Sequence, residues 1–339
     1  MRWWACAALL AAGGSTREGS AWAAEAPAAE KGKWTIISDR LLSELEKEGK
    51  KPDWPGKTTG VVVDRTTGDT FVLIPGQGIW RTADKGATFK RVDGGKIGGR
   101  CETGWTIHMD PGGKRMVCFM LDGPSGYTLD GGKTWSGLAG MGRGWDYGAV
   151  DWTASEPKVI FALRHETGGE LYSSKDLGKT WKKVGTDPKI QGLGVVDAET
   201  LLLHREKGIE RSTDGGATWT KVSDLNPRSR VAVLFQGAVY WVGPAGLIAS
   251  KDKGRTWEVQ GSAVDAVMGP FFGKDERHAI VVGKKGFFET TDGGKTWKDA
   301  AALPDPECRV DWYGNYAWDP VGNVFYFANM GRPAWKYER

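Results

Sequence analysis

Short apolar runs, separated by polar segments rich in glycine, recur along almost the whole chain. Examples are GVVVD at 60–64, VIFAL at 159–163 and AVYWV at 238–242. Runs of about five residues have the length of β-strands, whereas helices need longer segments with apolar positions at every third or fourth place. The pattern therefore predicts an all-β protein with many tight turns.

One segment near the N-terminus has a helical pattern instead. Leu41, Leu42 and Leu45 fall on one side of a helix over 39–48, with Ser38 as its expected N-cap and Gly49 at its end. We expect one short helix that packs these leucines on the β-structure as a lid.

The first residues have the pattern of an export signal. Arg2 precedes an apolar run over 3–12, which is shorter than the ~20 residues that span a bilayer, and Ala21-Trp22-Ala23 resembles a cleavage site. The sequence predicts a signal peptide at 1–24, a linker at 25–33, one domain at 34–339, and a secreted or periplasmic protein without a membrane span. A disordered leader is the alternative.

One motif of Ser or Thr, Asp, Gly, Thr and an aromatic residue recurs six times, as in TLDGGKTW from Thr128. Its aspartates are separated by 46, 46, 38, 38 and 40 residues. A period near 40 residues is that of a four-stranded propeller blade. The Asp can accept backbone N–H bonds across its turn, the Gly tolerates a positive φ, and the aromatic ring can fill the space between sheets. The aspartates are Asp84, Asp130, Asp176, Asp214, Asp252 and Asp292.

These segments resemble Asp boxes, or BNR repeats, which occur in sialidases, sortilin-like receptors, xyloglucan hydrolases and photosystem II assembly factors. The resemblance implies a β-propeller in which each box lies between the third and fourth strands of a blade, opposite the ligand site. The resemblance assigns the six aspartates a structural role, but it indicates almost nothing about function.

The tail from 316 to 339 repeats the first three strands of a blade and ends before a box. The segment 33–38, with Trp34 at the place of the box aromatic, can supply the missing strand. Closing the last blade with this strand removes an exposed sheet edge. We therefore predict seven blades.

Charge and cysteine content exclude several classes of protein. The formal charge of +4 comes from 46 basic and 42 acidic residues spread along the chain, which does not favour a nucleic-acid partner. The spacing places Cys101 too far from Cys118 for a disulfide, and the four histidines are scattered. We expect no metal, no cofactor and a monomer.

Arginine and aromatic residues concentrate in the loops between blades and between second and third strands, which should share one face. In the implied propeller this is the ligand face. The candidate ligand-binding residues are Arg100, Glu102, Trp105, Arg143, Trp145, Asp146, Tyr147, Arg164, Arg205, Arg228, Arg230, Arg309, Asp311, Trp312 and Tyr313, and Glu166 and Arg332 lie in the same loops.

Guanidinium groups beside aromatic rings suit an acidic peptide or a sugar that carries carboxylate or sulfate. The alternative is a ring of structural ion pairs, such as Arg100 with Glu102 and Arg309 with Asp311. His165, between Arg164 and Glu166, is the one titratable side chain that hints at catalysis.

The resemblance leaves two functions open. The sialidase motif Phe/Tyr-Arg-Ile-Pro is missing, because Leu73 stands where its Arg belongs, and a xyloglucan hydrolase needs a cleft between two propellers. We therefore favour a non-catalytic protein that binds an anionic polypeptide or carbohydrate. The alternative is a glycoside hydrolase that uses carboxylates of the same face.

Overall fold

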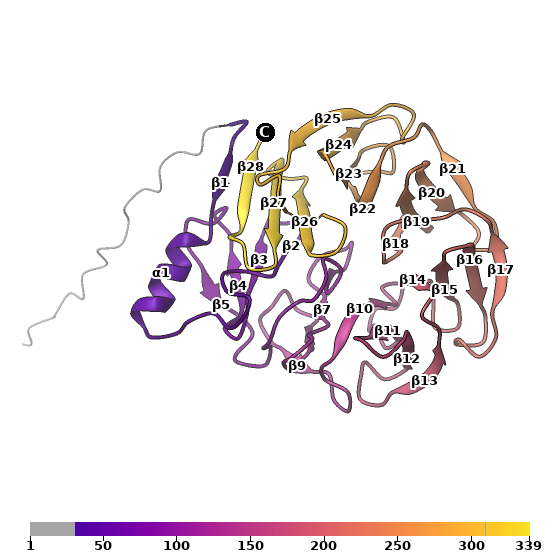
Figure 1. Cartoon of the computed structure of the whole chain (residues 1–339), viewed down its shortest axis with the longest axis horizontal. Helices are drawn as coiled ribbons and strands as arrows, with labels where there is room; N and C mark the ends of the chain where they lie inside the picture. Colours follow the sequence, from indigo (N-terminus) through magenta and orange to yellow (C-terminus); the bar gives the residue numbers. More distant parts are fainter. Residues whose placement is uncertain (1–30, 309) are drawn as a thin grey trace, which may run out of the picture.

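The computed structural model describes residues 31–308 and 310–339, which form seven four-stranded antiparallel sheets arranged around a ring (Figure 1). The signal peptide predicted at 1–24 lies outside the described residues, as does Arg309. The seven-bladed β-propeller expected from the repeat is confirmed. Blades 1 to 7 follow the order of their innermost strands along the chain.

The first three blades contain twelve strands in simple up-and-down order. Blade 1 comprises β2 (Gly60–Val63), β3 (Thr70–Ile74), β4 (Gly78–Thr82) and β5 (Lys90–Arg91); blade 2 comprises β6 (Ile107–Met109), β7 (Met116–Cys118), β8 (Gly126–Thr128) and β9 (Ser136–Gly137); blade 3 comprises β10 (Trp145–Val150), β11 (Ile160–Arg164), β12 (Glu170–Ser174) and β13 (Lys182–Thr186).

The next three blades repeat this order. Blade 4 comprises β14 (Ile190–Val195), β15 (Leu201–Arg205), β16 (Gly208–Ser212) and β17 (Thr220–Ser223); blade 5 comprises β18 (Val233–Phe235), β19 (Ala238–Gly243), β20 (Gly246–Ser250) and β21 (Glu258–Gln260); blade 6 comprises β22 (Ala266–Phe272), β23 (Ala279–Gly283), β24 (Gly286–Thr290) and β25 (Lys298–Ala302).

Blade 7 joins the two ends of the described chain, as the sequence predicts. It contains β26 (Gly314–Asp319), β27 (Val324–Asn329) and β28 (Trp335–Glu338), and its outer strand is β1 (Trp34–Ile36). Trp34 lies opposite Tyr337, and its indole N–H donates to the carbonyl of Ala302 at 2.8 Å.

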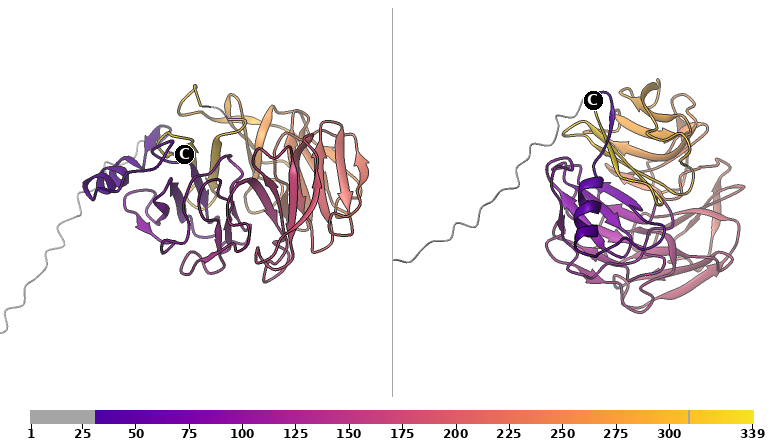
Figure 2. Two further views of the ribbon diagram at one scale, coloured as in Figure 1. Left: turned by 60° about the horizontal axis from the view of Figure 1, so that its bottom comes forward. Right: turned by 60° about the vertical axis from the view of Figure 1, so that its left-hand side comes forward.

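Helix α1 (Asp39–Lys47) follows β1 and lies outside the ring beside blade 1 (Figures 1 and 2). Leu41 and Leu45 are buried against strands of blades 1 and 7, as expected of a lid. The prediction that the Ser38 side chain caps this helix is wrong. The Ser38 hydroxyl makes no capping bond and instead accepts the backbone N–H of Ala334 at 3.0 Å, because the chain here is held against blade 7.

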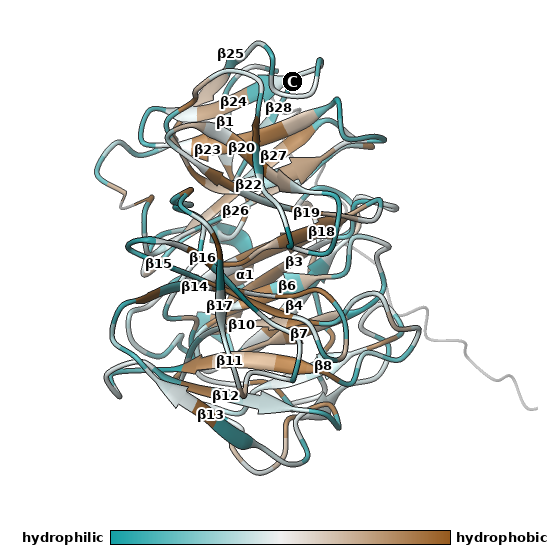
Figure 3. Ribbon diagram, turned by 90° about the vertical axis from the view of Figure 1, so that its right-hand side faces the viewer, coloured by the Kyte–Doolittle hydropathy of each residue, from teal (hydrophilic) through white to brown (hydrophobic). Residues whose placement is uncertain are grey.

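The inner strands carry the core and the outer strands face solvent. Strand β11 is almost entirely buried, whereas β13 exposes its lysines, a contrast visible in the hydropathy colours of Figure 3. Aromatic pairs join neighbouring blades, since Phe161 of blade 3 stacks on Trp219, the aromatic of the blade 4 motif, with ring centroids 5.9 Å apart.

Each repeated motif forms the turn between the third and fourth strands of blades 1 to 6, and we call these segments the Asp turns. In blade 3, the Asp176 carboxylate accepts two hydrogen bonds from Thr180, one from its backbone N–H at 2.8 Å and one from its side-chain hydroxyl at 2.6 Å. Ser174 donates to the same carboxylate at 2.8 Å and accepts the N–H of Gly178, whose φ is +80°. These bonds agree with the predicted structural role.

Candidate functional site

The face opposite the Asp turns is built from the connections between blades and the loops between second and third strands; we call it the loop face. The other face, which carries the Asp turns and the loops between first and second strands, is the turn face. Of the arginines singled out from the sequence, those within the described residues lie on the loop face, but they differ in what they contact.

Arg100 is held by two carboxylates and an aromatic ring. Its guanidinium lies 2.6 Å from Glu102 and 3.2 Å from Asp122, and it covers the ring of Trp54 at 4.6 Å from the centroid. The Arg100 and Glu102 side chains are only 13% and 11% exposed. This pair matches the structural ion-pair interpretation and not the ligand-binding one.

Three further arginines of the loop face are also neutralised by carboxylates. Their exposure ranges from 21% for Arg205 to 44% for Arg332. The pairs are Arg205 with Asp187 and Glu210, Arg228 with Asp265, and Arg332 with Asp305 and Glu307.

Arg230 makes an aromatic contact rather than a salt bridge. Its guanidinium lies 5.1 Å from the ring centroid of Trp312 and donates to the carbonyl of Gln191 at 2.8 Å. Both Arg230 and Trp312 are partly exposed, and on the same loop Asp311 is exposed and Tyr313 half-buried. Arg230 and Trp312, distant in sequence, are thus brought together.

Asp146 and His165 form a pair that the sequence did not indicate. Nδ1 of His165 lies 2.6 Å from the Asp146 carboxylate, and Nε2 lies 3.6 Å from exposed Glu166. Burial raises the pKa of Asp146, although the hydrogen bond with His165 opposes the shift. The hydrogen bond with Asp146 thereby orients the His165 ring.

Three aromatic side chains predicted for the ligand face are instead part of the core. Trp145 and Tyr147 are 0% and 1% exposed because β10 begins at Trp145, so the connecting loop ends earlier than expected; Trp105 is 6% exposed. The prediction that these three rings lie open to a ligand is wrong. Glu102 and Asp146 are buried as well.

A groove of about 550 Å³ lies on the loop face between blades 2 and 3. It is lined by residues 122–124, residues 140–143 and Arg164. One lining residue, Asp122, is acidic, and its carboxylate is paired with Arg100. Arg164 donates to the carbonyl of Arg143 at 2.5 Å, and its guanidinium lies 5.2 Å from the centroid of Trp145. Arg143 is exposed. In the part of the chain that the structure describes, neither arginine forms a salt bridge.

Trp54, which sequence reasoning passed over, is the most exposed large apolar side chain among residues 31–308 and 310–339, at 68%. The guanidinium of Arg100, a loop-face residue, stacks on the ring of Trp54, which places Trp54 on the same face. Trp54 lies between Pro52 and Pro55, outside the repeated motifs, so no pattern in the sequence marks it.

The described residues hold no group of three His, Cys, Asp or Glu side chains placed to bind a metal. Cys101, Cys118 and Cys308 are all free and buried, and burial raises the pKa of Cys308 to about 12. No helix within 31–308 or 310–339 is both long and apolar enough to cross a bilayer.

The fold and this face define the class: a seven-bladed β-propeller with a basic groove on the face opposite its Asp turns. No family model matches the sequence. The chain is 35% identical over 117 residues to the dispase autolysis-inducing protein of Streptomyces mobaraensis, and 31% identical over 127 residues to a xyloglucanase of Hypocrea jecorina. These matches cover 33% and 32% of this chain but only 31% and 15% of those relatives.

Two solved structures share the fold over most of this chain. YCF48 bound to a D1 peptide matches with a TM-score of 0.50 over 92% of this chain and 99% of its own, at 13% identity. PorZ, a surface component of the type-IX secretion system of Porphyromonas gingivalis, matches with a TM-score of 0.53 over 84% of this chain and 37% of its own, also at 13% identity. Identities this low establish the propeller fold alone.

Proposed function

We propose that this protein is a binding propeller that holds an acidic polypeptide segment in the groove between blades 2 and 3. The observation that carries the proposal is the pair Arg143 and Arg164. Both guanidiniums lie at a concave surface, and no carboxylate of the described residues forms a salt bridge with them. Arg100, Arg205, Arg228 and Arg332, in contrast, already have carboxylate partners.

The groove has the chemistry that carboxylates require. A guanidinium offers two parallel N–H donors to a carboxylate, and such charge-assisted bonds are among the strongest that proteins make. Arg164 is held over Trp145, which itself packs on Trp181 with ring centroids 4.6 Å apart. Because the aromatic support fixes the guanidinium in advance, little conformational entropy is lost when a ligand binds.

A polypeptide ligand is preferred to a carbohydrate because the groove itself presents no exposed aromatic face. Trp145 beneath Arg164 is fully buried, so no ring in the groove can stack on a sugar. The YCF48 structure contains a bound D1 peptide, which makes a peptide a reasonable first ligand class to test. We include two further predictions in this proposal. The protein belongs to the Asp-box proteins, and residues 1–24 direct its export.

Polysaccharide hydrolysis is the second candidate, favoured by the partial sequence match to a xyloglucanase. Hydrolysis needs two carboxyl groups that face the scissile bond, one of them able to donate a proton. The raised pKa of Asp146 suits a proton donor, but its carboxylate is bound to His165 and Glu102 is bound to Arg100. Binding therefore accounts for these contacts better than hydrolysis does.

The test is the affinity for fluorescein-labelled hexaglutamate, measured by fluorescence anisotropy at low salt. We expect the double variant Arg143→Ala/Arg164→Ala to bind at least about tenfold more weakly than the unmodified chain, since two charge-assisted contacts are lost. The matched control is Arg228→Ala/Arg332→Ala, which removes the same charge from ion-paired residues of the same face and should change the affinity less than about threefold.

Equal losses in the two double variants would contradict the proposal, because attraction would then depend on net charge and not on the groove. Two further ligands separate the alternatives. Stronger binding of a sulfated or uronic oligosaccharide than of hexaglutamate would assign the groove to carbohydrates. Release of reducing ends from xyloglucan, abolished by Asp146→Asn, would establish hydrolysis.

A further inference from the structure

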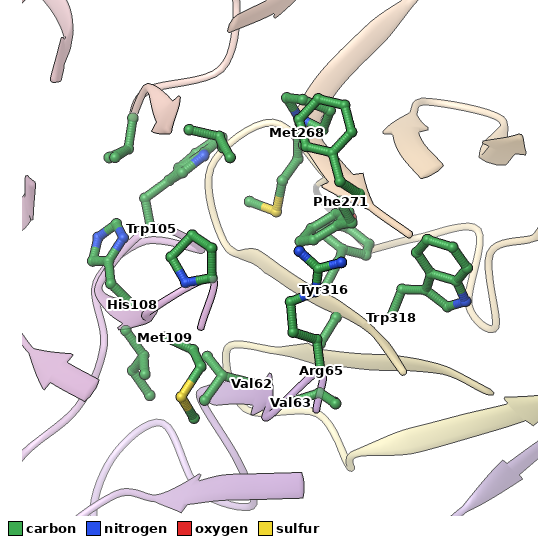
Figure 4. Close-up of a pocket in the computed structure, with 18 of the residues that line it drawn as sticks. Val62, Val63, Arg65, Trp105, His108, Met109, Met268, Phe271, Tyr316 and Trp318 are labelled. Carbon is green, nitrogen blue, oxygen red and sulfur yellow. The ribbon is translucent and has the colours of Figure 1, made fainter. Parts of the chain in front are cut away.

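A second cavity, separate from the loop-face groove, lies along the central axis of the ring. Its volume is about 200 Å³, and the first strands of several blades form its wall. Most side chains of the wall are apolar, among them Val62, Met268 and Phe271 (Figure 4). The space therefore favours a hydrocarbon group over a polar one.

The cavity is closed toward the loop face. Gly104 donates its backbone N–H to the carbonyl of Trp312 at 2.9 Å and accepts the side-chain amide of Asn315 at 2.8 Å. Asn315 in turn accepts the backbone N–H of Val61 at 2.6 Å. A Cβ at Gly104 would fall on the carbonyl oxygen of Gly314, so blades 1, 2 and 7 meet here without space between them.

The opposite end of the cavity reaches the turn face, where Arg65 lies across it. Arg65 follows β2 of blade 1, and its guanidinium donates to the carbonyl of Gly273 in blade 6. The guanidinium also covers the ring of Phe235 in blade 5, 4.8 Å from the centroid. In Figure 4 the Arg65 side chain extends from the Val62 side of the cavity toward Phe271. A ligand that enters from the turn face therefore meets this guanidinium.

The positive charge of Arg65 has no carboxylate partner among the described residues. Of the residues that line the cavity only Asp110 is acidic, and its carboxylate is paired with Arg115. Burial lowers the pKa of Arg65, because the charged guanidinium is partly removed from water, but an arginine stays protonated at neutral pH even so. The mouth of an apolar cavity thus carries an uncompensated positive charge.

Most hydrogen-bond donors of this guanidinium remain available. The bond to Gly273 uses one N–H of Nη2, which leaves a complete two-donor edge of the guanidinium unused. Nε and Nη1 make no hydrogen bond with the described residues, and neither is among the polar atoms buried without a partner, so both have surface open to solvent. Arg65 differs in this from His108 and Tyr316, whose unpartnered polar atoms are inaccessible.

We propose that this cavity binds a small monocarboxylate with a hydrocarbon tail, its carboxylate on Arg65 and its tail along the apolar wall. A single guanidinium with a free two-donor edge matches a single carboxylate. A cavity of about 150 Å³ holds the six carbons of benzene, so a volume of about 200 Å³ suits a tail of about eight carbons. The site lies on the face opposite the acidic-peptide groove and does not depend on it.

The test compares octanoate, 1-octanol and acetate by isothermal titration calorimetry of the full chain at low salt. We expect octanoate to bind one to one. The alcohol has the same chain without the charge and should bind at least about tenfold more weakly, since it loses a charge-assisted hydrogen bond. Acetate keeps the charge without the chain and should not bind measurably at concentrations that saturate octanoate.

Three results for the unmodified chain would overturn the proposal. Absence of octanoate binding would exclude the site. Equal affinities for octanoate and 1-octanol would mean that Arg65 only bridges the blades, and equal affinities for octanoate and acetate would mean that the cavity takes no part.

A pair of arginine variants tests the role of the charge. Arg65→Gln removes the charge but keeps an amide donor, so octanoate should bind no more tightly than 1-octanol, whose own affinity should change less than about threefold. The matched control is Arg277→Gln, which removes the same charge from an exposed residue of the turn face and should leave the preference for octanoate unchanged. A preference that survives in Arg65→Gln, or that falls equally in both variants, would contradict the assignment.

A second pair of variants locates the site. Met268→Trp fills the cavity and should abolish binding of octanoate and 1-octanol. Val321→Trp adds the same side chain at an exposed position and should leave both affinities unchanged. If Met268→Trp fails to fold, Val62→Phe fills the same space with a smaller change. Unaltered binding in a folded cavity-filling variant would place the ligand elsewhere and refute the proposal.

Discussion

Ring closure by β1 depends on Trp34, and removal of this side chain should destabilise the whole propeller. The half-buried indole packs against Phe287 and Tyr337, with ring centroids 5.6 Å and 5.3 Å apart, and donates to the carbonyl of Ala302. The hydrogen bond contributes about 1 kcal/mol and each aromatic pair about 0.5–1.5 kcal/mol. Trp34→Ala should therefore lower the free energy of unfolding by about 3 kcal/mol.

The measurement is equilibrium unfolding in urea, followed by circular dichroism, with Trp34→Phe as the matched variant. Phenylalanine keeps most of the ring packing but loses the indole N–H, so its cost should be about 1 kcal/mol. Hydrogen exchange gives a local readout. The amides of β28 that pair with β1 should exchange faster in Trp34→Ala, whereas those of β14 and β15, far from this blade, should change only with global stability.

Two results would refute this reasoning. A loss below about 1 kcal/mol in Trp34→Ala would mean that β1 is dispensable for closure. Equal losses in Trp34→Ala and Trp34→Phe would mean that the hydrogen bond, and not the packing of the ring, holds the strand.

Three further outcomes follow from contacts in the structure. Arg100→Ala should cost about 2–3 kcal/mol in urea unfolding because it leaves a buried carboxylate unpaired, whereas Arg228→Ala, from an exposed pair, should cost under about 1 kcal/mol; equal costs would contradict this. Hydrogen bonds from neighbouring threonines lower the pKa of Asp176 and Asp292 from the usual value of 3.8 to about 2. The urea midpoint should therefore be constant above about pH 5 and fall between about pH 5 and pH 2, as the unfolded chain takes up protons that the folded Asp turns refuse; no fall by about pH 2 would argue against the Asp turns. Gly104→Ala should lower the melting temperature because a Cβ has no space there, and an unchanged melting temperature would show that the blades can separate.

The fold could be predicted because its signal is local and repeated. Each Asp turn needs an acceptor, a residue with positive φ and an aromatic ring at fixed places, so the turns mark the blades directly. Closure by β1 also followed, since Trp34 stands where the motif aromatic stands. What the sequence could not supply was the role of Ser38, whose hydroxyl contacts a residue almost three hundred positions away.

The candidate site was harder to predict because it depends on pairing between loops. Arg100 with Glu102 is a local pair and was foreseen as an alternative, but Arg228 with Asp265 and His165 with Asp146 join different loops. The burial of Trp145 was also predicted wrongly, because the glycine-rich loop before it passes directly into an inner strand and nothing in the sequence marks where exposure ends.

The position of the ligand is tested most directly by hydrogen–deuterium exchange with and without saturating hexaglutamate. We expect slower exchange in two segments of the loop face that line the groove, residues 122–123 and 140–143, with no change in the Asp turns. Protection confined to the Asp turns, or spread evenly over both faces, would contradict the claim that the groove holding Arg143 and Arg164 is the binding site.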